Sequence, residues 1–194
     1  MLKDLIQKNR SYRRFDASYK LSDDTLRDLI DLARISPSAA NRQPIKYVLV
    51  NQDDQLDKIF PCIGWAAYLQ DWKGPEPKER PTAYIIMITE LQIAPHVNID
   101  PGICAQSILL GATEKGLGGC MIGSMNKNKL RKILNIPNTY EVLLVIALGK
   151  PVESVVLETI DKDGDIRYWR DENNVHHVPK RKLDDIIVKF EEQI

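Results

Sequence analysis

The stretch DPGICAQSILLGATEKGLGGCMIGS, residues 100–124, does most to decide the fold. Asp100 and Pro101 predict the start of a helix, with the aspartate as N-cap and the proline at the first position, where no backbone donor is needed. The residues that follow, to about Lys115, are apolar on nearly every side. Such a helix should lie in the centre of the protein or in an interface between two copies. Gly116 can end it in the left-handed conformation that favours glycine.

The second half of this stretch, GLGGCMIGS at residues 116–124, is rich in glycine and otherwise mostly apolar. It has too much glycine for a helix and is too apolar for a flexible linker. Backbone that closely approaches something flat has this composition, because glycine leaves no side chain in the way. A tight turn into an edge strand would give the same pattern. Both interpretations stay open for the stretch taken alone.

Apolar runs on either side of this stretch predict the sheet. Residues 83–89 and 142–148 are nearly unbroken apolar runs, which are typical of strands covered on both faces. Before them, Ser22 is the expected N-cap of a one-faced helix that ends before Pro37, and a short strand follows at 46–50. Shorter helices are expected at 2–9, at 127–134 and from 183. Helices and strands are mixed rather than alternating, which predicts an α+β fold with a central mixed, mainly antiparallel sheet flanked by helices.

No repeat or linker divides the chain, so a single domain over residues 1–194 is expected. Within it, residues 60–82 combine prolines, aromatic residues and scattered charges, which suggests a surface excursion or lid. An Asp163-Gly164 pair predicts a hairpin-like turn between the apolar residues before and after it. Residues 175–194 form a basic tail followed by the terminal helix.

Composition excludes several classes of function. Lys plus Arg and Asp plus Glu both number 27, so no bulk charge attracts the protein to nucleic acid or to a membrane surface. The three cysteines are scattered, and the paired histidines at 176–177 have no third ligand nearby, so no metal site is expected. The first residues do not resemble a signal peptide, and no apolar run is long enough to span a membrane. We therefore expect a cytoplasmic protein with reduced thiols.

Three polar clusters are candidates for binding. Arginines in NRSYRRF, residues 9–15, suit a phosphate because guanidinium groups bind oxyanions in a bidentate way, although basic residues also occur at helix C-termini. Amides in SPSAANRQP, residues 36–44, can meet a heterocycle, although the stretch also fits an ordinary loop. A basic triplet at 180–182 opposes the dipole of the terminal helix, so an external anion would explain it, as would simple solvation.

In their order and spacing, these elements together resemble the nitroreductase-like flavoprotein family, of the NAD(P)H nitroreductase and quinone reductase type. The shared pattern is RSxR after the first helix, PSxxNxQP some 25 residues later, GLGxCxIG after the apolar helix, Gly149-Lys150-Pro151 and a basic tail. The resemblance covers nearly the whole chain. It implies a nitroreductase-like fold and an intertwined homodimer with two FMN sites, each lined by both subunits.

The resemblance also implies which residues hold FMN. The first group would bind the phosphate, the ribityl chain and the pyrimidine side of the ring, and consists of Arg10, Ser11 and Arg13. The second group would reach the flavin from the opposite subunit, with its last member supporting the loop, and consists of Pro37, Ser38, Ala39, Asn41 and Gln43.

Two further groups complete the implied site. Met121 and Ile122 would lie against the ring, while the backbone N–H of Gly123 would point at N5. Lys180 and Lys182 would complete the phosphate site, and Arg181 could replace either of them. Many relatives carry a basic residue at the position of Asn9, so the phosphate site here would depend more on the tail.

The implied activity is that of an FMN-dependent oxidoreductase. NADH or NADPH would supply reducing equivalents, and a flat electrophile such as a nitroaromatic or quinone would accept them in a ping-pong cycle. The chemistry would belong to the cofactor, so no catalytic residue is expected. The segment 65–80 differs from the better-known nitroreductases and is expected to shape the substrate side of the flavin. Two alternatives stay open: a non-catalytic FMN carrier or sensor, and a specialised member such as a flavin-fragmenting or dehalogenating enzyme.

Overall fold

A computed structural model describes residues 1–94 and 96–189 of the chain. It divides into two compact units. Unit 1 comprises Met1–Trp65 and Lys73–Val152, and unit 2 comprises Ala66–Trp72 and Glu153–Ile194 as far as it is described. The expected excursion at 60–82 is therefore shared between the units, and its role as a lid stays a prediction. The last five residues of the expected terminal helix lie outside the described residues.

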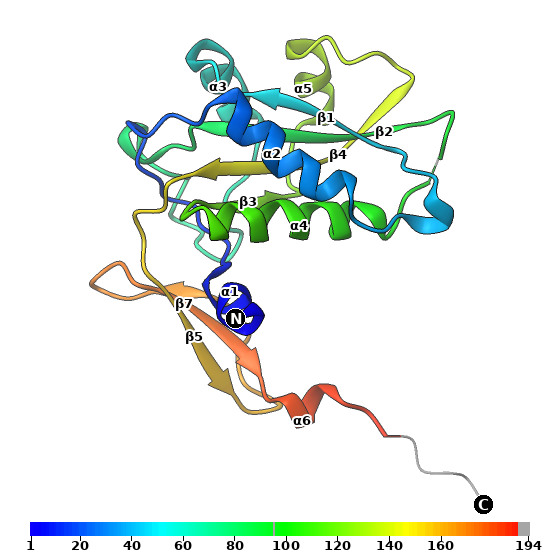
Figure 1. Ribbon diagram of the computed structural model, residues 1–194. Coiled ribbons are helices and arrows are strands. Elements are labelled where there is room, and N and C mark those ends of the chain that lie inside the picture. The colour runs from blue at the N-terminus through cyan, green and yellow to red at the C-terminus, as the bar shows by residue number, and fades with distance from the viewer. Residues whose placement is uncertain (95, 190–194) are drawn as a thin grey trace, which may run out of the picture. The chain divides into compact units, whose positions relative to one another are not determined.

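Unit 1 is built on a four-stranded sheet (Figure 1). Its strands are β1 (Ile45–Val50), β2 (Ala83–Glu90), β3 (Gly118–Ile122) and β4 (Tyr140–Gly149). Their order is β1-β2-β4-β3, and every neighbouring pair is antiparallel. The predicted α+β class is confirmed. The edge-strand interpretation also holds for the glycine-rich stretch, because β3 is an outer strand of this sheet.

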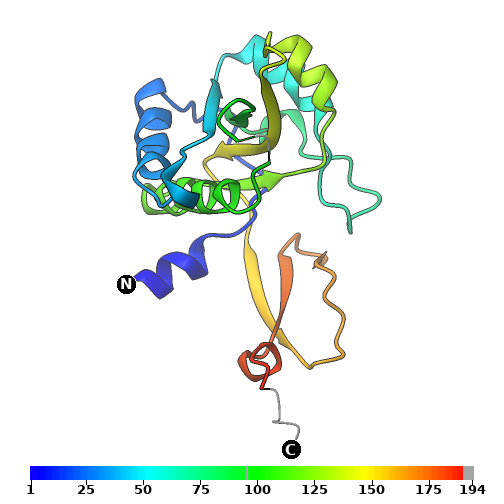
Figure 2. The same ribbon diagram turned by 90° about the vertical axis from the view of Figure 1, so that its right-hand side faces the viewer.

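Helices cover both faces of this sheet. On one face lie α2 (Asp23–Arg34) and α4 (Asp100–Glu114), and on the other lie α3 (Asp53–Ile59) and α5 (Lys127–Ile133), as Figure 2 shows. Strand β2 contributes to the hydrophobic cores on both faces of the sheet, because successive side chains of a strand point to opposite faces. Its Ile85 and Met87 pack with α2 and α4, whereas its Ile86 packs with α3 and α5. Burial of β2 on both faces, predicted from its unbroken apolar run, is confirmed.

Two of the predicted helix ends are confirmed, and one is wrong. Ser22 caps α2 by accepting the Thr25 N–H at 3.2 Å, and Gly116 adopts a φ of +71° after α4. The expectation that Asp100 is the N-cap of α4 is wrong, because the helix begins at Asp100 and Ile99 is its cap. The Asp100 carboxylate is buried and instead accepts hydrogen bonds from the Ser38 hydroxyl and the Ala39 N–H.

Unit 1 also contains one short helix at the N-terminus and tight turns between its larger elements. Helix α1 (Leu2–Lys8) buries none of its residues. Three 3₁₀ turns, η1 (Ala39–Asn41), η2 (Phe60–Cys62) and η3 (Pro77–Glu79), connect the larger elements. The first of them contains left-handed backbone at Ala40, with a φ of 49°.

Unit 2 contains a three-stranded sheet of order β5-β7-β6. Its strands are β5 (Val155–Ile160), β6 (Trp169–Arg170) and β7 (His176–Arg181), and α6 (Leu183–Ile186) follows. The predicted hairpin at Asp163-Gly164 is wrong. The turn exists, with the Gly164 N–H donating to the Asp161 carbonyl at 2.9 Å, but β7 pairs in parallel with β5 and separates it from β6.

Aromatic and charged contacts fasten the segment 66–72 to this sheet. The Arg170 guanidinium lies 4.3 Å from the centre of the Trp72 ring and donates to Glu153 at 3.0 Å. In the centre of the sheet, the His177 ring stacks on Trp169 at 4.1 Å. Partial removal from water lowers the pKa of His177, but hydrogen bonds to two acidic side chains outweigh this and raise it above its usual value. The nearer acceptor is Glu158, at 2.6 Å.

Candidate functional site

The basic segment after α1 lies along the free edge of β3. Ser11 forms a parallel bridge with Gly119, and the Tyr12 N–H donates to the Gly119 carbonyl at 3.0 Å. A Cβ at Gly119 would lie 2.4 Å from the Ala147 carbonyl oxygen, and one at Gly118 would lie 2.5 Å from the Tyr12 ring. These two glycines therefore allow close packing within the protein itself. We call residues 9–15 the arm.

Arg10 of the arm is half-buried and Arg13 is buried. Arg10 donates from Nη2 to the Ile6 carbonyl at 2.7 Å, while its Nε is buried and has no hydrogen-bond partner among the described residues. This burial lowers the pKa of Arg10. Arg13 is 9% exposed and donates from Nη1 to the Ser11 carbonyl at 3.2 Å. The arm thus concentrates positive charge at the edge of β3, where an acceptor near Arg10 would be stabilised.

A bidentate ion pair fixes the arm from its other side. Arg14 donates from Nε and Nη2 to the Glu79 carboxylate at 2.8 and 2.6 Å. The side chains of Arg14 and Glu79 are 22% and 16% exposed. The Phe15 N–H also donates to the Glu79 carbonyl at 2.9 Å. Turn η3, at the end of the excursion, therefore holds the arm in place.

The end of β3 presents alternate residues to the core and to solvent. Ile122 is 4% exposed and packs in the core with α3 and α5, so only its backbone could face a bound ring. Met121 and Gly123 are exposed. A Cβ at Gly123 would meet nothing within 4 Å, and its φ lies outside the left-handed region. Gly123 is thus open to a ligand, and the contact of its backbone N–H with a bound ring stays a prediction.

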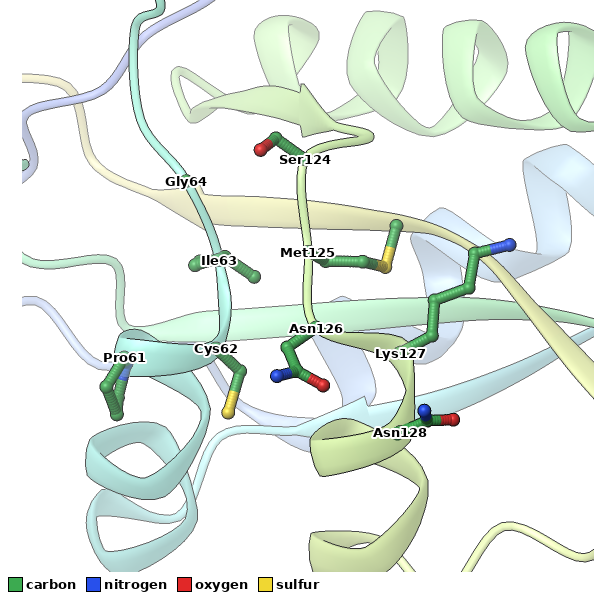
Figure 3. A pocket seen from close by; sticks show the side chains of 9 residues that line it. All are labelled: Pro61, Cys62, Ile63, Gly64, Ser124, Met125, Asn126, Lys127 and Asn128. Atoms are coloured by element: carbon green, nitrogen blue, oxygen red, sulfur yellow. The ribbon is translucent and has the colours of Figure 1, made fainter.

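A cavity of about 660 Å³ begins one residue beyond Gly123 and is lined by residues 61–64 and 124–128 (Figure 3). The two segments run side by side in the figure because Ile63 and Met125 form an isolated antiparallel bridge. The Gly64 N–H donates to the Ser124 carbonyl and the Asn126 N–H donates to the Cys62 carbonyl, each at 2.7 Å. Asn126 also accepts the Lys129 N–H and so caps α5. This cavity extends the exposed end of β3.

The second predicted group, within residues 37–43, forms a loop at the start of α4, whereas the arm lies near the strand that follows the end of this helix. The Ser38 hydroxyl donates to the Asp100 carboxylate at 2.6 Å, and the Ala39 N–H donates to it at 3.0 Å. The Gln43 side chain donates to the Asn41 amide oxygen at 3.1 Å, and the role of both residues toward a flavin stays a prediction. Pro37 is exposed between α2 and η1.

Within one chain, α4 separates the loop from the arm. The loop is held at the first residue of α4, whereas the arm pairs with β3, which returns from the last turn of α4 (Figure 1). Helix α4 has 15 residues, so its length is about 22 Å. The arm and the Ser38 loop, which contain the first two predicted groups, are therefore not adjacent to each other in one chain.

The basic residues of the tail belong to unit 2. Lys180 lies on β7 and is exposed. Lys182 donates to the Asp161 carboxylate at 2.5 Å, and Arg181 donates to the Lys162 carbonyl. Their part in a phosphate site stays a prediction.

Two important groups were not found from the sequence. Asp100 was assigned to a helix cap, although a buried acid before a helix can equally accept donors from a neighbouring loop. The pairing of Arg14 with Glu79 joins residues 65 positions apart, and nothing in the local pattern indicates it. Among the described residues, no helix is long and apolar enough to cross a membrane, and no group of three or more His, Cys, Asp or Glu side chains could hold a metal ion.

These features define an α+β protein whose antiparallel sheet lies between two helical layers and carries a basic arm on its edge strand. The model of the nitroreductase family matches residues 6–150, and the chain belongs to this family. The resemblance found in the sequence is therefore confirmed.

Individual relatives agree with this assignment. The chain is 23% identical over 184 residues to an oxygen-insensitive NADPH nitroreductase of Helicobacter acinonychis, covering 78% of this chain and 88% of that protein. It is similar in fold to an FMN-dependent nitroreductase of Clostridium difficile R20291, with a TM-score of 0.64 and 21% identity over 77% of this chain and 87% of that one. It is also similar to a nitroreductase family protein of Streptococcus pneumoniae TIGR4, with a TM-score of 0.71 and 17% identity over 98% and 100%.

Proposed function

We propose that the chain binds FMN and transfers reducing equivalents from NADH or NADPH to a flat electrophile such as a quinone or nitroaromatic. The observation that carries the proposal is the pairing of Ser11 with Gly119. It aligns a partly buried basic arm with β3, which ends at Ile122, just before the open position Gly123. The names of the Helicobacter and Clostridium relatives support NADPH as a reductant and FMN as the cofactor, respectively.

The residues of the arm fit an anionic cofactor. Arg10 has a buried Nε without a hydrogen-bond partner among the described residues, and an unsatisfied buried donor is costly. A phosphate oxygen would satisfy it, and the guanidinium would neutralise the phosphate charge. Arg13 and Ser11 would extend the same site along the arm. This fit follows from the arrangement of the chain and does not depend on the names of its relatives.

When bound, FMN supplies a ring that accepts a hydride from the nicotinamide and gives it up to the second substrate. The chain's own contribution is position and charge. The Gly123 backbone N–H would donate to the ring without a side chain in the way. A positive group near the pyrimidine carbonyls would stabilise negative charge that develops on the ring, by the same physics as an oxyanion hole. No side chain is required as an acid or base, and both substrates would use one space in turn.

We further propose that each site forms between two copies of the chain. A single ligand in contact with both the arm and the Ser38 loop would have to span the length of α4. A second copy can instead bring its own loop to the arm of the first. Partly exposed Ile103 and Leu110 on α4 provide apolar surface for such an interface. Obligate dimers commonly bury more than about 2,000 Å² of surface.

The decisive test is the absorption spectrum of the purified protein, followed by identification of the released flavin. A yellow protein that releases FMN, and that oxidises NADH or NADPH steadily in the presence of a quinone, is expected. A colourless protein that takes up no FMN would refute the proposal. Flavin binding without turnover would instead support the carrier or sensor alternative. Light scattering at micromolar concentration should show a dimer, and a flavin-bound monomer would exclude the shared site.

A sharper test concerns Arg13. In the Arg13→Ala variant, FMN binding should weaken by roughly 1.5–3 kcal/mol, or about 10- to 100-fold, while riboflavin binding changes little. Equal losses of affinity for FMN and riboflavin would indicate that Arg13 contacts the ring side of the flavin and not the phosphate. Arg27→Ala, on the exposed surface of α2, is the matched control and should change neither affinity.

A further inference from the structure

We propose that unit 1 also binds a neutral aromatic molecule with one ring and one hydrogen-bond donor, of the phenol or aniline class, in a cavity between α2, β1 and α4. The cavity has a volume of about 220 Å³. This inference does not rest on the proposed function, because the cavity and its lining belong to the chain itself.

The size of the cavity suits a single ring. A dry cavity of about 150 Å³ in another protein is large enough for benzene. The present volume therefore accommodates a single ring with one or two small substituents.

The walls of the cavity are mainly apolar. Ile30 and Ala33 come from α2, and Pro44 and Ile45 come from the start of β1. Of these, Ala33, Pro44 and Ile45 are buried, and Ala33 and Ile45 belong to the core beneath α2 and α4. Burial of a ring against such surface is favourable by about 25 cal/mol for each Å² removed from water.

Among the polar groups that line the cavity, Asp100, Tyr47 and Cys104 bear most on the chemistry of a ligand. Asp100 is 2% exposed and lines the cavity. Its two oxygens accept one hydrogen bond each from the Ser38 loop, and a carboxylate can accept about four, so capacity is left for a donor on a ligand. Tyr47 and Cys104 also line the cavity, and burial raises the pKa of each, which keeps both neutral near pH 7.

The charge inside the cavity therefore favours a neutral donor over an anion. The Asp100 carboxylate would repel a benzoate but would accept a hydrogen bond from a hydroxyl or amino group. The two cations at the rim are both engaged elsewhere. Arg34 donates to Asp31 at 2.6 Å, and Lys46 lies 3.7 Å from the Glu90 carboxylate.

The cavity adjoins the predicted flavin loop without being part of the arm. Ser38 and Gln43 line it, and Asp100 holds the Ser38 hydroxyl and the Ala39 N–H. A ligand that donates to Asp100 therefore shares an acceptor with this loop. Occupancy of the cavity and the position of the loop should be linked, and such linkage is reciprocal.

The test is a titration of the full-length protein with 4-fluorophenol followed by ¹⁹F NMR. Saturable binding is expected with a dissociation constant on the order of 1 mM, as suits so small a ligand. Fluorobenzene, which lacks the donor, should bind about tenfold more weakly, the loss of one hydrogen bond. 4-Fluorobenzoate should not bind. In ¹³C-methyl spectra of the unmodified protein, nuclear Overhauser effects should connect the bound ring to the methyl groups of Ile30 and Ile45.

A filling variant locates the site independently. Ala33→Leu should abolish 4-fluorophenol binding, whereas the matched control Ala17→Leu, which faces a different cavity, should leave it unchanged. Thermal melting checks that each variant folds. If Ala33→Leu does not fold, the Overhauser effects in the unmodified protein still locate the bound ring.

Three results would overturn the proposal. The absence of saturation at concentrations about tenfold above the expected constant would show that the cavity takes no such ring, including the case in which a second copy fills it. Equal affinity for fluorobenzene would remove the role of Asp100. Undiminished binding to a folded Ala33→Leu variant would place the ligand elsewhere. None of these measurements depends on flavin, so a protein without FMN would refute the proposed function and leave this inference standing.

Discussion

The ion pair between Arg14 and Glu79 should stabilise unit 1 by about 2 kcal/mol. Its two hydrogen bonds measure 2.8 and 2.6 Å, and its side chains are 22% and 16% exposed, between a surface pair and a buried one. Surface pairs contribute about 0–1 kcal/mol, whereas breaking a buried pair costs about 3–5 kcal/mol. Glu79→Gln keeps the shape of the side chain but removes its charge. For a protein of this size, the expected loss lowers the melting temperature by about 4–8 °C.

Because other contacts of Arg14 and Glu79 change in each single variant, a double-mutant cycle with Arg14→Met and Glu79→Gln is the appropriate assay. Urea unfolding of the four proteins isolates the coupling between the two side chains. The matched control is the exposed pair of Lys20 and Asp53, at 2.5 Å with side chains 54% and 73% exposed, where Lys20→Met and Asp53→Asn should show a coupling below about 0.5 kcal/mol. A coupling at Arg14 and Glu79 no larger than that of the control pair would refute the reasoning.

Three further outcomes are expected. Gly123→Ala should leave the melting temperature unchanged because its Cβ meets open space, whereas Gly119→Ala should destabilise the protein by about 1–3 kcal/mol because its Cβ would meet the neighbouring backbone; equal melting temperatures would contradict this. The raised pKa of His177 implies a contribution to stability that is fully present below about pH 6.5 and is lost as the pH rises through the higher folded value. His177→Asn should therefore flatten the pH dependence of the unfolding of unit 2, as measured by hydrogen exchange, and an unchanged slope would exclude His177 as its source. Asp100→Asn should increase hydrogen exchange at the Ala39 N–H because a neutral acceptor holds it less tightly, and unchanged protection would show that the loop is held by other contacts.

Much of unit 1 could be predicted from the sequence because its elements are determined locally. The unbroken apolar run of β2 reports burial on two faces, and Ser22 and Gly116 mark helix ends by their own chemistry. The pairing of strands in unit 2 could not be predicted in this way. The Asp163-Gly164 turn has residues typical of a hairpin, but β5 pairs with β7, which lies later in the chain, instead of with β6.

The candidate site was predictable in composition but not in arrangement. The order of the motifs indicated the arm, the loop and the end of β3, and family membership over residues 6–150 is confirmed. The sequence does not reveal that Ile122 turns into the core while Met121 and Gly123 stay exposed, because this depends on the register of β3 against β4. Nor does it reveal the long-range contacts of Asp100 and Glu79, which depend on how the loops close.

The bridge between Ser11 and Gly119 also bears on how the protein avoids aggregation. Strand β3 is at the edge of its sheet, and an uncovered edge presents unpaired N–H and carbonyl groups to any passing strand. The arm occupies this edge at Gly119, where the Tyr12 N–H takes up the carbonyl. A chain shortened to begin after Phe15 would expose the edge next to a run of small residues. The same short segment that is proposed to bind the cofactor thus also protects the sheet from joining its neighbours.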